Sequence, residues 1–94
     1  MDINYSKPVN FEIKNYGEKA KIYDLGFREY DARWLYPEQI NLSGIQKVGL
    51  GLGKLIKKSG NNNKIAVGHD FRSYSEEIKE ALIGGLIAEG IDVY

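Results

Sequence analysis

Residues 27–34 (F-R-E-Y-D-A-R-W) combine charge and aromatic rings in a way that favours an anion-binding site. Four of the eight side chains are charged and three are aromatic. Buried charges are costly, so this stretch is poor material for a core strand, and disordered segments are short of aromatic residues. The mixture suits the rim of a polar site, where rings form the walls and guanidinium groups bind an anion.

A second stretch of this kind, residues 69–75 (H-D-F-R-S-Y-S), follows a β-branched run at residues 64–68. In open α/β sheets, ligands collect at the carboxyl ends of strands and at helix N-termini. An arginine fork matches phosphate bidentately, so phosphate is the expected anion. The candidate phosphate ligands are Arg28, Arg33 and Arg72.

Arg33 stands out among them because the phenol of Tyr30 is placed to add a hydrogen bond to the same ligand. The competing interpretation is a structural ion-pair corner, in which the arginines pair with Glu29, Asp31 and Asp70.

Other chemistries find less support. His69, next to Asp70, is a candidate general base, although a hydrogen-bonded structural histidine is the commoner case. Residues 49–54 (G-L-G-L-G-K) do not match the G-x-x-x-x-G-K-[ST] phosphate loop and lie inside a helical pattern. No carboxylates have metal-binding spacing, and the chain carries no complete catalytic set.

Composition narrows the class of protein. The 94 residues suffice for one domain, and the 43% hydrophobic content supports a modest core. Thirteen basic and thirteen acidic residues leave a formal charge of +0, which predicts no general attraction to nucleic acid or to anionic membranes. Without cysteines, a secretory signal or a long apolar run, we expect a cytoplasmic protein that does not insert into a membrane.

The first half of the chain is read as an arm followed by a strand and a helix. Residues 1–20 form a polar N-terminal arm, and residues 21–25 are predicted to be a strand. A helix is expected to begin with Ser43 as its N-cap and to end at Gly60. Its glycines suggest close packing against a neighbour; they are Gly49, Gly51 and Gly53.

The second half predicts a strand at residues 64–68 and a helix that ends at Gly90. Ser73 and Glu76 form a capping box at the start of that helix, and residues 91–94 begin a third strand. The strand–helix–strand–helix–strand order predicts an α/β fold with a short, mostly parallel sheet. Because the last strand is clipped, we expect an incomplete first domain of a larger enzyme.

Three ordered blocks resemble the α-D-phosphohexomutases. Residues 27–33 resemble the opening F-R-x-Y-D-x-R motif of that family, and residues 67–75 resemble its V-G-R-D-x-R-x-S-S segment. Residues 81–93 are similar to the A-L-x-x-G-L…G-x-D-V run that follows. The resemblance covers about residues 25–94 and is greatest to the bacterial phosphomannomutase/phosphoglucomutase branch, which makes residues 21–94 part of the first of four domains.

The resemblance implies transfer of a phosphoryl group between the 1- and 6-positions of a hexose through a phosphoserine. It implies Mg²⁺ and a hexose 1,6-bisphosphate activator in the parent enzyme, with a hexose phosphate and the remaining domains as partners. Tyr30 and Arg33 would face the cleft and bind substrate or phosphate, and Arg72 and His69 would be secondary ligands.

Two positions depart from the family pattern: His69 stands where an arginine is usual, and Trp34 where a glycine is usual. The serine nucleophile, the magnesium loop and the sugar-selecting loop of the family have no counterpart in these residues. We therefore expect the chain alone to be inactive.

Two alternatives stay open. One is a non-catalytic remnant of a split mutase gene, which self-associates or binds a partner through the exposed edge of its final strand. The other is a generic anion-binding α/β module.

Overall fold

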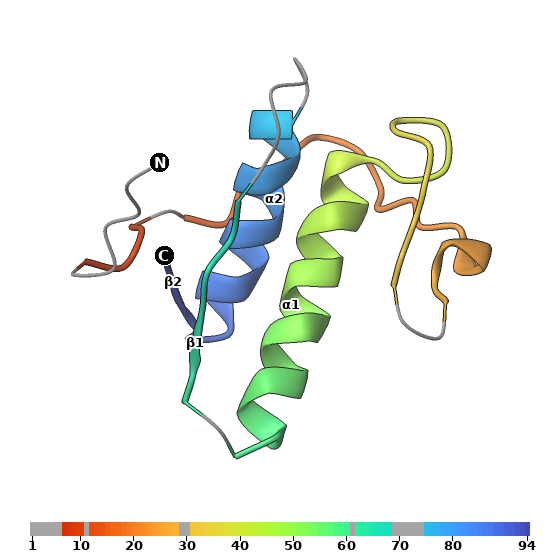
Figure 1. Cartoon of the computed structure of the whole chain (residues 1–94). Helices are drawn as coiled ribbons and strands as arrows, with labels where there is room; N and C mark the ends of the chain where they lie inside the picture. Colours follow the sequence, from red (N-terminus) through yellow and green to blue (C-terminus); the bar gives the residue numbers. More distant parts are fainter. Residues whose placement is uncertain (1–6, 11, 29–30, 61, 69–74) are drawn as a thin grey trace.

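The computed structural model describes residues 7–10, 12–28, 31–60, 62–68 and 75–94. Within these ranges it contains a short 3₁₀ helix, two α-helices and two strands; these are η1 (Asp24–Gly26), α1 (Leu42–Lys58), β1 (Lys64–Ile65), α2 (Ser75–Ala88) and β2 (Asp92–Val93). Figure 1 shows α1 and α2 side by side, with the strands next to α2 and the segment before α1 projecting on the other side of α1.

The two strands form a parallel sheet, as the sequence predicted. Lys64 pairs with Asp92 and Ile65 with Val93. Further hydrogen bonds continue the pairing on both sides, from Asp92 N to Asn63 O and from Tyr94 N to Ile65 O. The fold is therefore α/β, consistent with the expected class.

The predicted strand at residues 21–25 is wrong. Ile22 makes an isolated antiparallel bridge to Ile40, and η1 follows directly. Tyr23 N donates to Gln39 O, so this segment pairs with the connector before α1 and stays outside the sheet. Leu25 is 92% exposed, which shows that its apolar side chain does not reach a core.

Helix α1 begins two residues earlier than predicted, because Asn41 is its N-cap. The Asn41 Oδ1 accepts from Gly44 N at 2.8 Å. The predicted cap, Ser43, lies inside the helix and its Oγ donates to Glu18 O. At the other end, Gly60 has φ +77°, a left-handed conformation that suits glycine just past a helix, as predicted.

Glycines let the two helices cross closely. A Cβ on Gly49 would collide with Leu82 O of α2, and one on Gly85 would collide with Gln46 O of α1. Gly53 packs against Glu89, whereas Gly51 has nothing within 4 Å. The close packing predicted from three glycines is thus confirmed for two and wrong for Gly51.

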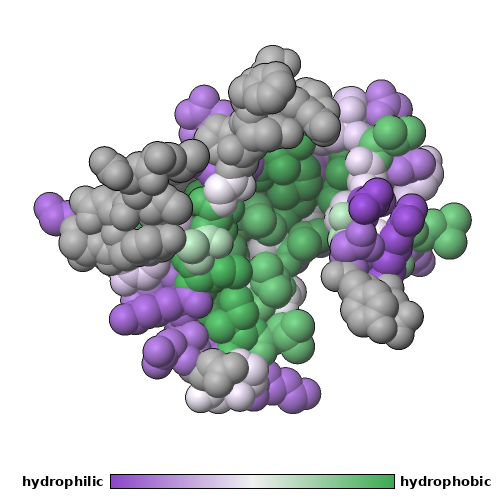
Figure 2. Space-filling view, in the orientation of Figure 1, coloured by the Kyte–Doolittle hydropathy of each residue, from purple (hydrophilic) through white to green (hydrophobic). Residues whose placement is uncertain are grey.

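Two buried clusters form the core of the described part of the chain. One lies between the helices and the sheet and consists of Ile83, Leu86, Ile91 and Val93. The other lies near the start of α1 and consists of Ile40, Ile45 and Ala81. Figure 2 shows the apolar side chains gathered in the middle of the molecule and the hydrophilic ones around them.

Helix α2 ends before Gly90, which has φ +83°, as expected. The predicted cap Ser73 lies outside the described residues, so the capping box stays a prediction. The outer side of β2 is not open along its whole length, because Val9 N donates to Val93 O. That bond places part of the N-terminal segment where the sequence predicted an unpaired edge.

Candidate functional site

Of the five candidate site residues, Arg28 and Arg33 lie in the described part of the chain, both exposed, while Tyr30, His69 and Arg72 lie outside it. The Arg33 side chain is 74% exposed, and its Nε contacts Asp31 Oδ2 at 3.1 Å. Asp31 is itself 45% exposed. One of the expected acidic partners is therefore present, at the surface.

A chain reversal presents Arg33. Arg28 N donates to Asp31 O at 2.9 Å, and Phe27 forms an antiparallel bridge with Ala32. Arg33 N then donates to Gly26 O at 2.8 Å. We call residues 26–28 and 31–34 the arginine loop, because these bonds turn the chain so that Arg33 lies beside the residue at which the reversal begins.

Trp34 closes the base of the arginine loop. Its Nε1 donates to Tyr23 O at 2.7 Å, and its ring meets Phe27 edge-on with 4.9 Å between centroids. A Cβ on Gly26 would collide with the indole. This role of Trp34 was not predicted, because an aromatic residue eight positions after a glycine gives no signal of the contact.

The arrangement leaves Arg33 available to an anion. A guanidinium carries five N–H donors, and among the described residues Asp31 engages Nε. An exposed ion pair contributes about 0.2–1 kcal/mol, so a phosphate can compete for this group or share it. The ion pair and phosphate binding are therefore compatible.

Shifted titration occurs away from this loop. Burial raises the pKa of Tyr16, with Glu80 and Glu77 adding to the effect. Burial also raises the pKa of Tyr36, next to Glu77 and Glu18. Both tyrosines pack against the cluster near the start of α1, and their raised pKa values reflect that packing.

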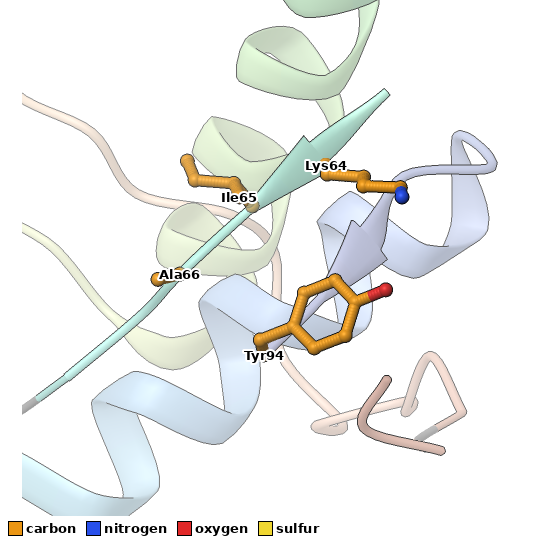
Figure 3. Close-up of a pocket in the computed structure, with 4 residues that line it drawn as sticks. All are labelled: Lys64, Ile65, Ala66 and Tyr94. Carbon is orange, nitrogen blue, oxygen red and sulfur yellow. The ribbon is translucent and has the colours of Figure 1, made fainter. Parts of the chain in front are cut away.

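An open hollow of about 340 Å³ lies along the sheet, lined by Lys64, Ile65, Ala66 and Tyr94. Figure 3 shows the Lys64 and Tyr94 side chains extending to the same side of the strands. Arg33 is not among the lining residues, so this hollow is separate from the arginine loop.

Two kinds of feature are absent from the described residues. No three histidine, aspartate or glutamate side chains there come together as metal ligands. No helix in the same ranges is long and apolar enough to cross a bilayer.

Comparison with known proteins identifies the family. Residues 24–94 match the phosphoglucomutase/phosphomannomutase family, alpha/beta/alpha domain I. A phosphoglucomutase/phosphomannomutase of Thermococcus kodakarensis is 35% identical over 68 residues, which cover 71% of this chain and 15% of that protein. An Escherichia coli phosphomannomutase is 37% identical over 67 residues, 71% of this chain and 14% of its own length.

A probable phosphoglucosamine mutase of Pyrococcus abyssi is 45% identical over 47 residues, 50% of this chain and 10% of its own length. No solved structure matches the chain significantly. The chain thus spans about 10–15% of the length of these relatives. Since the family match includes the arginine loop, both helices and the parallel strands, the chain belongs to the phosphoglucomutase/phosphomannomutase family and corresponds to its domain I.

Proposed function

We propose that the parent protein transfers a phosphoryl group between the 1- and 6-positions of hexose phosphates through a phosphoserine, and that this chain supplies part of its phosphate-binding surface. The observation that carries the proposal is the exposed Arg33 guanidinium, held by Asp31 inside the matched domain. Phosphoryl transfer depends on positioning and charge stabilisation, for which a fixed arginine is well suited.

Within this proposal Tyr30 and Arg33 bind the substrate or its phosphate, and Arg72 and His69 are secondary ligands. Mg²⁺ and a hexose 1,6-bisphosphate activator belong to the whole parent enzyme, which we place in the cytoplasm. The described residues bring together no metal-ligand cluster.

Sugar-phosphate binding tests the site. We expect glucose 6-phosphate to perturb the amide signals of Arg33 and its neighbours in an NMR titration of the 94-residue chain. Arg33→Gln should weaken binding by about 10- to 100-fold, because a charge-assisted hydrogen bond contributes about 1.5–3 kcal/mol. The matched control is Lys54→Gln, which removes another exposed cation that pairs with a carboxylate, Glu89 at 3.9 Å. Equal affinity in wild type and Arg33→Gln would leave Arg33 as a structural ion-pair member.

Catalysis by the chain alone is not expected, because the resemblance places the serine nucleophile and the magnesium loop beyond these residues. A coupled assay with glucose 1-phosphate, Mg²⁺ and glucose 1,6-bisphosphate should give no turnover above a protein-free blank. Multiple turnovers by purified chain would contradict this.

The alternative function, a self-associating or partner-binding remnant, is favoured by a specific observation on β1. Alternate residues along β1 and its flanks form main-chain hydrogen bonds with the last strand; these are Asn63, Ile65 and Val67. Ala66 lies between them, and no main-chain hydrogen bond joins it to any described residue. The open edge therefore belongs to β1, and a sheet edge of this kind can accept another strand.

A further inference from the structure

Trp34 occupies a position where the family motif usually has glycine. In this structure its side chain makes contacts that a glycine could not make. A glycine there would have no side chain to hold the loop. The indole instead packs against the buried cluster of Ile40, Ile45 and Ala81, so it ties the arginine loop to the core.

Three further contacts fix the indole itself. Its Nε1 donates to Tyr23 O at 2.7 Å, which satisfies the ring's single polar group. Phe27 meets it edge-on at 90°, and Gly26 is buried beneath it with no room for a Cβ. A ring held on these sides has little freedom to turn.

The constraint passes to Arg33 by two routes. Arg33 precedes Trp34, so the fixed indole limits the backbone that carries the guanidinium. In addition, Arg33 N donates to Gly26 O at 2.8 Å, and Gly26 is the residue against which the indole packs. Asp31 then orients the guanidinium through Nε.

We propose that Trp34 is a positioning residue that pre-organises Arg33 for phosphate binding. This inference rests on the proposed role of Arg33 as a phosphate ligand. Pre-organisation lowers the entropy lost when a ligand orders a loop, so its removal weakens binding without removing the charge.

The test compares Trp34→Gly, which restores the family's usual residue, with the conservative Trp34→Phe. We expect Trp34→Gly to speed hydrogen exchange at the Arg33 amide by at least about 10-fold and to weaken glucose 6-phosphate binding by about 5- to 20-fold. Trp34→Phe keeps an aromatic ring but not the indole N–H. It should therefore recover a large part of both the slow exchange at Arg33 and the affinity for glucose 6-phosphate. Exchange at the Asp92 amide, which donates across the sheet to Asn63 O at 2.8 Å, reports whether the rest of the fold remains intact.

The chain's single tryptophan supplies a spectroscopic readout. Glucose 6-phosphate should change its emission in wild type and leave it unchanged in Arg33→Gln. The positioning role is overturned if Arg33→Gln weakens binding while Trp34→Gly leaves both affinity and Arg33 exchange unchanged. If Arg33→Gln does not weaken binding, the proposed phosphate role of Arg33 fails instead, and the positioning proposal fails with it.

Discussion

Two amide side chains, both buried, join the N-terminal segment to α1. Asn41 accepts from Lys21 N at 2.9 Å as well as from Gly44 N, and its Nδ2 donates to Lys19 O at 2.7 Å. Gln46 bonds both main-chain polar groups of Lys14, at 2.9 and 2.7 Å. Each amide uses both its donor and its acceptor, so a segment without regular structure is held by specific bonds.

Replacement of Asn41 should show how much this attachment contributes. Asn41→Ala removes a helix cap and leaves main-chain groups of the arm without their partner, so we expect a loss of about 2–3 kcal/mol in the free energy of unfolding. Urea denaturation followed by circular dichroism measures it.

Asn41→Asp keeps the acceptor but loses the donor, and should recover part of that loss. Ser43→Ala is the control, because its bond to Glu18 O is exposed and should contribute less than about 1 kcal/mol. A loss no larger for Asn41→Ala than for Ser43→Ala would contradict the role of Asn41 in joining the N-terminal segment to α1.

Tyr16 and Tyr36 predict a loss of stability at alkaline pH. Burial raises both pKa values in the folded state, above the unfolded value of about 10. The folded chain holds these protons more tightly, so their contribution is complete below about pH 10 and falls as the pH rises through the folded pKa. The double variant Tyr16→Phe/Tyr36→Phe should lose less stability between pH 9 and 11.5 than wild type, as measured by urea denaturation. If the double variant and wild type lose the same free energy of unfolding between pH 9 and 11.5, other groups cause the alkaline loss.

At the residue scale, the sequence predicted Arg33 as a phosphate ligand from its charge and the neighbouring rings, and that role stays a prediction. The contacts that hold the arginine loop were not predicted. The cap Asn41 was missed because Ser43 is also a good N-cap, and the choice between them is made by a contact with Lys21 that is 20 residues away. The indole on Gly26 is likewise a tertiary contact that no local pattern encodes.

At the element scale, the helix crossing offers a matched pair of glycines. Gly49→Ala forces a Cβ against Leu82 O of α2 and should destabilise the chain by about 1–3 kcal/mol. Gly51→Ala meets nothing within 4 Å and should stabilise it by about 0.5–1 kcal/mol, the helix preference of alanine over glycine. Thermal or urea unfolding of the two variants measures the direction of both stability changes. Two changes of the same sign would contradict the crossing.

The helices and the parallel strands could be predicted because their patterns are local and their ends are marked by Gly60 and Gly90. The strand at residues 21–25 could not be separated from a true sheet member, because a short apolar run has the same pattern in either place. Its partner decided the outcome: Ile22 pairs with Ile40, next to the cap of α1, and not with β1 or β2.

At the scale of the whole molecule, the sheet is small and unequally protected. A two-stranded sheet needs packing against other elements for stability, and here the helices cover one face. Val9 bonds to the outer side of β2. The outer side of β1 carries Ala66, whose main-chain groups have no partner among the described residues, beside the open hollow.

This asymmetry predicts concentration-dependent self-association through β1. The formal charge of +0 gives two copies no net repulsion, and an open edge is a template for strand addition. Sedimentation velocity of the 94-residue chain should show dimers or larger species that increase with concentration.

Ala66→Pro removes the outward N–H and leaves the bonds of Ile65 and Val67 to the last strand in place, so it should reduce association. Ala66→Lys adds charge at the same exposed edge without restricting the backbone and should act in the same direction. Association that persists in both variants, with unfolding unchanged, would locate the contact elsewhere on the molecule. The next residues to substitute would then be the exposed Leu25 of η1 and Phe27 directly after it.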